Sequence, residues 1–325
     1  MATVLITGGT GMIGKALGKS LLDKGYSVII LTRNPDKKTK YDANVSKEAN
    51  RLSYAKWDVE KQDITKSAIS KADYIVHLAG ASVAEKRWTQ KRKNEIVNSR
   101  INSSKLIAES LKEIHNNVKT IISASATGWY GSPSLTLPKG EGKEIPFIET
   151  DSPGNNFLGQ TCKQWEESMQ PITSLGKRLV TLRIGIVLSK EGGALPEFIK
   201  PLRFGIATIL GSGSQMMSWI HIDDLVSMLI YAIENETMNG IYNAVAPQPV
   251  SNKNLVLTLA KSMKGKFFIP VHVPSFVLKL LLGEMSVEAL KSATVSSEKI
   301  INAGYQFQYS DIKNSLKQLA GKISS

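Results

Sequence analysis

Three glycines near the start of the chain have the type and spacing that could bind a phosphate. Gly8, Gly11 and Gly14 follow a short apolar run and precede a helical pattern. Glycine adopts positive φ and places no Cβ between the backbone and a ligand. The unpaired N–H groups and the dipole of a helix that begins here favour an anion such as a pyrophosphate. Because the glycines lie between a strand and a helix, we interpret them as a dinucleotide-binding turn; the alternative is a glycine turn that binds nothing.

The residues after the second apolar run distinguish between two dinucleotides. An acidic residue about twenty positions beyond the glycines would bind the ribose 2′-hydroxyl of NAD. This chain instead has Thr32 and Arg33, with Lys37 and Lys38 close behind. A guanidinium suits a 2′-phosphate through charge-assisted hydrogen bonds. The sequence therefore favours NADP(H) over NAD, with the alternative that Arg33 is only an exposed loop charge.

These residues need alternating strands and helices to position them. Residues 4–7 and 27–32 are β-branched apolar runs typical of buried strands, and residues 12–24 have an apolar helical face that Gly25 ends. Further strands are predicted at 53–57, 72–81, 120–125, 179–185, 217–222 and 240–244, and further helices at 88–115, 157–169, 223–235, 251–264, 274–282, 286–302 and 310–321. This alternation predicts an α/β fold with a doubly wound parallel sheet of the Rossmann type.

Two strand ends supply further candidate ligands. Asp58 ends the third strand, where a carboxylate can accept from an adenine amino group, cap the next helix, or do both. The fourth strand runs into Leu78, Ala79 and Gly80, where the backbone can approach a cofactor at the carboxyl end of the sheet. His77 lies within the same apolar strand, so we interpret it as a core histidine and not a catalytic one.

The length of the chain predicts more than one hydrophobic core. Its 325 residues exceed the usual size of a single core. We expect an NADP-binding Rossmann domain from residues 1–185 plus about 219–245. We expect a smaller mixed α/β C-terminal lobe, which binds substrate, from about 186–218 plus 246–325.

Composition and charge exclude several classes of protein. A hydrophobic content of 42% with 21% charged residues is ordinary for a globular protein. The single cysteine, Cys162, excludes an internal disulfide and a multi-cysteine metal site, and it suits a reducing cytosol. We find no secretion signal and no apolar run long enough to span a bilayer. We therefore expect a cytoplasmic protein with no membrane partner and no metal.

The net charge of +13 raises the question of an anionic partner. The densest basic segment, residues 86–100, has helical polarity, and Trp88 is its only interleaved aromatic residue. This pattern favours a solvated helix face over a nucleic-acid patch. We expect a small-molecule substrate and no specific nucleic acid, with weak polyanion binding at low salt.

Segments along the whole chain occur in the order typical of one superfamily. They are residues 7–14, Asp58, 77–80, Asn98, 123–127, 183–185 and 219–225. On these segments the chain resembles the extended short-chain dehydrogenase/reductases, the superfamily of nucleotide-sugar epimerases and dehydratases. It is similar, more narrowly, to an uncharacterised "epimerase family protein" subgroup in residues 125–131, 162–166, 211–213 and 274–307. The resemblance implies the Rossmann fold and its cofactor, but carries little information about the substrate.

The strand ends and the resemblance together give a set of candidate cofactor ligands. These are Gly8, Thr10, Gly11, Met12, Ile13, Gly14, Thr32, Arg33, Asp58, Leu78, Ala79, Gly80 and Asn98. Superfamily members often dimerise through the long helices after the fourth and fifth strands. The resemblance therefore also implies a homodimer.

The chemistry of the family uses a Ser or Thr, a Tyr, and a Lys four residues after that Tyr. The Tyr–Lys spacing is one helical turn, which puts both side chains on one face. Ser125 matches the family serine, and Lys163 lies in the helix where the lysine belongs. Four residues before Lys163 is Gly159; if Cys162 takes the lysine position instead, four residues back is Leu158. The Tyr-x-x-x-Lys pair is absent in either register.

Other side chains are candidates for the missing proton-transfer group. Tyr130 is the nearest phenol, although a structural role under the loop at residues 128–154 is favoured. Cys162 is favoured as a small buried helix residue, and Glu166 and Asp151 have weaker support. Two functions remain open. One is an epimerase/reductase-like enzyme that uses NADP(H) on an unknown carbonyl, hydroxyl or nucleotide-sugar substrate, and the other is a non-catalytic NADP(H)-binding sensor or interaction protein.

Overall fold

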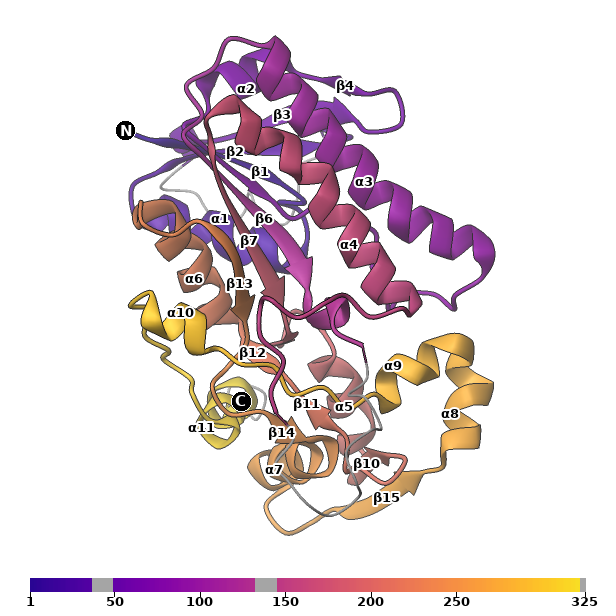
Figure 1. Cartoon of the computed structure of the whole chain (residues 1–325). Coiled ribbons are helices and arrows are strands. Elements are labelled where there is room, and N and C mark those ends of the chain that lie inside the picture. Colours follow the sequence, from indigo (N-terminus) through magenta and orange to yellow (C-terminus); the bar gives the residue numbers. More distant parts are fainter. Residues whose placement is uncertain (37–48, 132–144, 322–325) are drawn as a thin grey trace.

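An eight-stranded sheet forms the centre of the larger part of the molecule (Figure 1). The computed structural model describes residues 1–36, 49–131 and 145–321, so Lys37 and Lys38 lie outside the described residues. The strands are, in spatial order, β13 (Gly240–Ala244), β7 (Arg178–Ile184), β6 (Thr120–Ala126), β5 (Tyr74–His77), β1 (Thr3–Thr7), β2 (Ser27–Thr32), β3 (Leu52–Asp58) and β4 (Asp63–Ile64). Only the β3–β4 pair is antiparallel. This confirms the predicted α/β class and the doubly wound parallel sheet.

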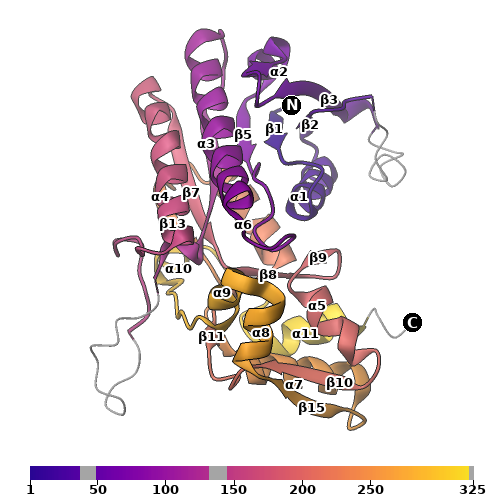
Figure 2. The ribbon, with the colours of Figure 1, turned by 90° about the vertical axis from the view of Figure 1, so that its right-hand side faces the viewer.

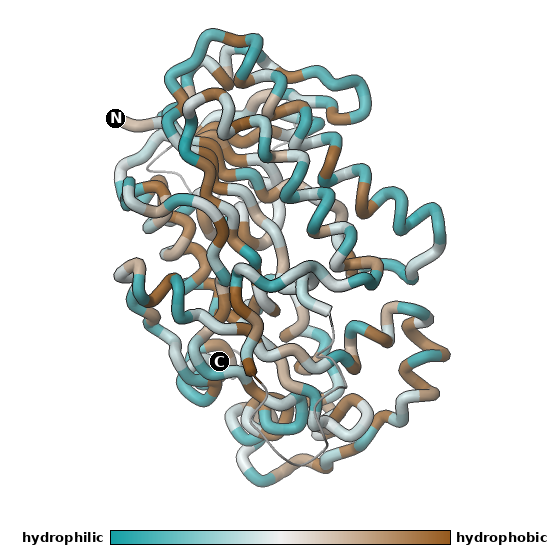
Figure 3. The backbone as a smooth tube through the Cα atoms, viewed as in Figure 1, coloured by the Kyte–Doolittle hydropathy of each residue, from teal (hydrophilic) through white to brown (hydrophobic). Residues whose placement is uncertain are grey.

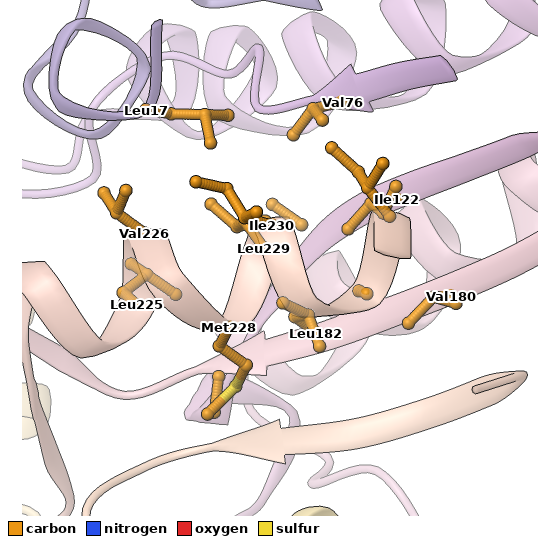
Figure 4. Packing of buried hydrophobic residues seen from close by; sticks show 14 of the residues in the cluster. Leu17, Val76, Ile122, Val180, Leu182, Leu225, Val226, Met228, Leu229 and Ile230 are labelled. Carbon is orange, nitrogen blue, oxygen red and sulfur yellow. The ribbon is translucent and has the colours of Figure 1, made fainter. Parts of the chain in front are cut away.

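Helices cover both faces of this sheet. They are α1 (Met12–Asp23) and α6 (Ile222–Glu234) on one face, and α2 (Lys66–Lys71), α3 (Gln90–Glu113) and α4 (Phe157–Met169) on the other. The long helices α3 and α4 run side by side in both views (Figure 2). Hydrophobic residues follow the strands through the interior (Figure 3). In Figure 4, Leu225, Leu229 and Ile230 of α6 point toward the sheet, which buries the apolar stripe of that helix.

Side chains at the helix ends determine where the two long helices begin. Thr89 precedes α3, and its Oγ1 accepts from Arg92 N at 3.2 Å. Asn156 precedes α4, and its Oδ1 accepts from Gly159 N at 2.9 Å. Each bond satisfies one of the N–H groups that a helix leaves unpaired at its start.

The smaller part of the molecule contains three short sheets below the large one in Figure 1. Their strands are β8 (Ile186–Ser189), β9 (Gly192–Gly193) and β12 (Trp219–His221); β10 (Ile206–Leu210) and β15 (Ile269–Val273); and β11 (Met216–Met217) and β14 (Val250–Ser251). Their helices are α5 (Leu195–Leu202), α7 (Asn252–Lys264), α8 (Ser275–Leu282), α9 (Ser286–Leu290), α10 (Glu298–Asn302) and α11 (Ile312–Gly321). The sequence did not predict β10 and β15. Each is short; β10 lies between two glycines, and β15 contains one proline and is followed by another, so neither shows a clear period.

Among the described residues, each face of the large sheet has a hydrophobic cluster, and a third cluster belongs to the smaller part. Leu255, Leu316 and Ile209 belong to a cluster confined to the smaller part. Ile300 and Tyr305, within the predicted lobe, pack instead in the cluster beneath the large sheet. The proposed domain boundaries therefore remain a prediction about folding units. In the described ranges, no helix is long and apolar enough to cross a membrane.

Candidate functional site

The glycine turn at the start of α1 forms an open backbone cradle. Gly8 has φ +67°, and its carbonyl accepts from Gly11 N at 3.0 Å. A Cβ on Gly14 would overlap Gly8 O and lie 2.5 Å from Gly9 Cα, so only glycine allows this closure. A Cβ on Gly11 would meet only Gly8 O, and no side chain caps the helix. The first N–H groups of α1 therefore face free space that an anion fits.

Three further residues of this turn were candidates: Thr10, Met12 and Ile13. Thr10 is exposed, and Met12 and Ile13 are half-buried in the first turn of α1. The side chain of Met12 lies against β9, because a Cβ on Gly192 would be 3.4 Å from Met12 Sδ. Met12 thus closes one side of the cradle against the smaller part of the molecule.

The ends of β2 and β3 place two cations next to one another. Arg33 is exposed directly after β2, and the strand register sets Thr32 opposite Lys56 of β3. A surface hollow of about 470 Å³ is lined by Arg33, Asn34, Pro35, Asp36 and Lys56. Sequence reasoning missed Lys56, although its place two residues before the end of a strand was a usable signal.

Asp58 caps a turn at the end of β3. Its Oδ1 accepts from Glu60 N and from Lys61 N, each at 3.1 Å. The sequence allowed a cap on the next helix, but that helix, α2, begins only at Lys66, so Asp58 caps a turn instead. Contact with an adenine remains a prediction.

His77 is a core residue, as predicted. It is fully buried, and its Nδ1 and Nε2 lie 2.8 Å from Thr7 Oγ1 and 3.1 Å from Ser104 Oγ. Thr7 Oγ1 also accepts from Leu78 N and Ala79 N, each at 3.1 Å. The Thr7 hydroxyl therefore donates to Nδ1, which makes Nε2 the protonated nitrogen. Burial lowers the pKa of His77 to about 4.

The hydrogen bonds to Thr7 occupy the backbone N–H groups that follow β5. The N–H groups of Leu78 and Ala79 are occupied, so they are not free to bind a ligand. Gly80 lies next, and a Cβ there would be 3.1 Å from Arg100 Cζ. The lack of a side chain at Gly80 therefore makes room for an arginine of α3.

Arg100 of α3 reaches this edge of the sheet, and the contact of Asn98 with a cofactor stays a prediction. Asn98 is exposed on α3. Arg100 Nη1 donates to Ala81 O at 3.0 Å and to Ile96 O at 2.9 Å. Positions two apart on a helix do not share a face, so Arg100 and Asn98 point in different directions. The sequence contained Arg100 only as part of a basic run, so nothing distinguished it from its solvated neighbours.

Ser125 is part of a buried hydrogen-bonded network at the end of β6. Its side chain is 2% exposed, and its hydroxyl donates to Glu166 Oε1 at 2.6 Å. Arg183 of β7 donates to the same carboxylate through Nε (2.9 Å) and Nη2 (3.0 Å). The guanidinium also lies 3.7 Å from the ring centroid of Trp129. A bidentate, stacked ion pair of this kind is the arrangement for which arginine is suited.

Tyr130 belongs to the same network. Its hydroxyl donates to Asn243 Oδ1 at 2.6 Å and accepts from Arg183 Nη1 at 3.1 Å. Burial raises its pKa to about 12, and its ring stacks on Phe147. A fully buried phenol held from both sides agrees with the structural role favoured by the sequence.

On α4, Glu166 is bonded to Ser125, and the residue one turn earlier on the same side is Cys162. Its thiol donates to Ala126 O at 3.7 Å, and burial raises its pKa to about 11. Lys163 lies one position on, with its side chain 46% exposed and 3.8 Å from the carboxylate of Glu167. The structure therefore does not bring Lys163 to Ser125, because adjacent helix positions point about 100° apart. Leu158, one turn before Cys162, contacts Gly128.

The remaining proton-transfer candidate, Asp151, has a local role. Its Oδ2 accepts from Ile148 N at 2.8 Å within a turn, and its carbonyl accepts from Trp129 Nε1 at 2.8 Å. It therefore shapes the loop that holds Trp129. Over residues 1–36, 49–131 and 145–321, no three His, Cys, Asp or Glu side chains are grouped so as to hold a metal.

The C-terminal segment closes against the starts of both long helices. Arg87 donates to Leu280 O, and Lys93 forms an ion pair with Glu284. Next to α4, Asn156 Nδ2 donates to Glu288 Oε1 at 2.8 Å. These contacts make residues 280–288 a wall beside the ends of β5 and β6.

Comparison with known proteins gives the family. The model of the "NAD dependent epimerase/dehydratase family" matches residues 4–244, and a "Domain of unknown function" matches residues 273–319. Among relatives, an epimerase family protein of Staphylococcus aureus (strain MRSA252) is 36% identical over 99% of this chain and 100% of its own. Epimerase family protein YfhF of Bacillus subtilis (strain 168) is 35% identical, with 97% of each chain covered.

Solved structures share the fold. The human epimerase family protein SDR39U1, solved with NADPH, superposes with a TM-score of 0.81 at 26% identity over 98% of this chain and 99% of its own. The UDP-glucuronic acid 4-epimerase of Bacillus cereus, solved with NAD, has a TM-score of 0.77 at 19% identity over 99% of this chain and 100% of its own. With a family model that covers most of its length, the chain belongs to the NAD dependent epimerase/dehydratase family, within the extended short-chain dehydrogenase/reductases.

Proposed function

We propose that this protein binds NADP(H) across the carboxyl edge of its large sheet. The supporting observation is the open glycine cradle at the start of α1, followed by two cations at the ends of β2 and β3. The pyrophosphate would bind the N–H groups after Gly11. Arg33 and Lys56 would hold the 2′-phosphate of the adenosine half. The human relative solved with NADPH supports the same choice of cofactor.

We propose further that the protein is an epimerase/reductase-like enzyme acting on a carbonyl, hydroxyl or nucleotide-sugar substrate. When bound, a nicotinamide ring supplies a hydride donor or acceptor. The hydroxyl hydrogen of Ser125 is held by Glu166, so its lone pairs are the part left for a substrate. A substrate hydroxyl would donate to Ser125 Oγ, and Ser125 would pass its own hydrogen to Glu166. Arg183 holds the carboxylate in place for that transfer.

A second function, a non-catalytic NADP(H) sensor or interaction protein, has its own support. In place of a Tyr–Lys pair, α4 has Leu158 and Cys162 one turn apart, and neither moves a proton readily at neutral pH, which leaves Glu166 as the α4 side chain bonded to Ser125. Tyr130 is occupied by Asn243 and Arg183. The two functions share the cofactor and differ only in whether Ser125 and Glu166 take part in chemistry. A homodimer through α3 and α4 and a cytoplasmic location are proposals under either function.

Two measurements test these proposals. Titration of the protein with NADPH and NADH tests the cofactor: Arg33→Ala should weaken NADPH about ten- to hundredfold and leave NADH nearly unchanged. Equal losses for both would exclude the 2′-phosphate role of Arg33.

Hydride exchange between deuterated NADPH and a panel of carbonyls and sugar nucleotides tests catalysis. Any exchange should fall by about 10²-fold or more in Ser125→Ala and in Glu166→Gln while NADPH affinity is retained. Binding without exchange across the whole panel would favour the sensor.

A further inference from the structure

A cation without an acidic partner lies at the carboxyl end of β5. Arg100 reaches across from α3, and its Nη1 is held by Ala81 O and Ile96 O at 3.0 and 2.9 Å. No carboxylate of the described residues lies within ion-pair distance of it. By contrast, the two buried arginines of this region, Arg92 and Arg183, pair with glutamates, whereas Arg100 is half-buried. An arginine that is fixed in place but left without a counter-charge is suited to a ligand.

Donors remain free beside this guanidinium. Both hydrogens of Arg100 Nη1 are used, whereas Nε and Nη2 have no acceptor among the described residues. Trp165 lies under the same group, with 4.9 Å between Arg100 Cζ and its ring. The indole is 5% exposed, and its Nε1 has no acceptor in the described part of the chain. Buried donors of native proteins are normally bonded, so the unpaired indole of Trp165 indicates a missing oxygen acceptor, and the free hydrogens of half-buried Arg100 are available to the same ligand.

The strand order gives the part of a dinucleotide that would reach this place. The neighbouring strands run β3, β2, β1, β5 and β6. The cradle after β1 lies in the middle, and the cations Arg33 and Lys56 lie toward β3. A dinucleotide has its pyrophosphate between two nucleosides, so its second nucleoside must extend toward β5 and β6. Arg100 lies at the end of β5, and Ser125 belongs to the neighbouring strand β6.

We infer that Arg100 binds the nicotinamide ribose of the dinucleotide, with its Nε and Nη2 hydrogens directed at the ribose oxygens. The inference rests on the proposed cofactor and adds a residue of α3 to the site. Gly80 contributes to this binding site, because any Cβ there would push the Arg100 guanidinium away. The positive charge at this end of the cleft is thus supplied by α3, while α4 presents the uncharged Cys162.

The test compares a whole dinucleotide with its adenosine half. NADPH and adenosine 2′,5′-bisphosphate are titrated into the wild-type protein and into Arg100→Met, Arg100→Lys and Lys105→Met. Arg100→Met should weaken NADPH about ten- to hundredfold and change the bisphosphate less than about twofold. Arg100→Lys should bind NADPH more tightly than Arg100→Met, because lysine keeps the positive charge although it lacks the paired donors of a guanidinium. Lys105→Met, which removes an exposed cation of the same helix, should change neither ligand.

The outcomes separate the two proposals. Equal weakening of both ligands by Arg100→Met, or no weakening of either, would overturn the role of Arg100. Binding of the bisphosphate by the variant shows that it is folded, so loss of NADPH alone supports the inference. If the wild-type protein bound neither probe, the proposed cofactor itself would be excluded and the inference with it.

Discussion

The proposed cofactor site along the edge of the large sheet has two ends, for adenosine and for nicotinamide, and their side chains differ in burial. At the adenosine end, exposed cations follow β2 and β3, and water screens them. At the nicotinamide end, Ser125, Glu166 and Arg183 form a buried network in which each group has a partner. A residue of the first kind can change ligand preference without affecting folding. A residue of the second kind cannot be altered without an effect on stability, so binding and chemistry should separate under mutation.

The largest expected effect tests the buried end. Arg183→Met leaves the carboxylate of Glu166 buried without its cation, which should lower the free energy of unfolding by about 3–5 kcal/mol. Urea denaturation measures the change. Lys200→Met is the matched control, because its pair with Glu197 is exposed and should contribute less than about 1 kcal/mol. Similar losses in both variants would remove the distinction between buried and exposed cations.

A pH effect extends the comparison to the core behind the cleft. The pKa of His77 is lowered to about 4, below the 6.5 of an unfolded chain, so the unfolded state binds more protons between these values. The contribution of His77 to the free energy of unfolding should therefore be complete above about pH 6.5. It should be lost as the pH drops toward 4, by at most about 3 kcal/mol. Denaturation curves at several pH values measure this, with His115→Asn, at an exposed position, as control. If the free energy of unfolding of His77→Asn changes with pH as steeply as that of the wild-type protein, another group is responsible.

The cradle between the two ends should separate binding from stability. Gly11→Ala places a Cβ in the space left for the pyrophosphate, so NADPH affinity should fall about tenfold or more. Its φ of −78° suits alanine, and the unfolding free energy should change by about 1 kcal/mol or less. Calorimetric titration and thermal melts measure the two quantities. Gly14→Ala, which overlaps Gly8 O, should lose stability as well; equal melting losses in both variants would contradict this account.

The smallest effect concerns salt at the adenosine end. Raising ionic strength from about 0.05 to 0.5 M should weaken NADPH a few-fold more than NADH, because the additional phosphate contacts exposed cations. Titrations of both nucleotides across this range measure the difference. In Arg33→Ala the difference should shrink. An unchanged difference would place the 2′-phosphate away from Arg33.

Much of the fold was predictable because local patterns and global topology agree. The run before Gly8, the helix after it and Gly25 at its end follow one another in the chain, and the structure has them as predicted. Helix α4 also occupies the predicted range. By contrast, β10 and β15 are separated by more than fifty residues, and only their parallel pairing makes them strands. No local period could have shown them.

The residues of the candidate site also divide into those that the sequence predicted and those that it did not. The sequence alone determined the glycine cradle and the basic end of β2, because each is formed by neighbours in the chain. Only the tertiary structure decided that Arg100 reaches the end of β5 and that Lys163 points away from Ser125. It also decided that Glu166 accepts the hydrogen bond of the Ser125 hydroxyl. The rotation of a helix about its axis and the burial of a charge beside a distant partner are set by packing. A sequence records which residues are present, and the packing of α3, α4 and β7 decides which of them meet.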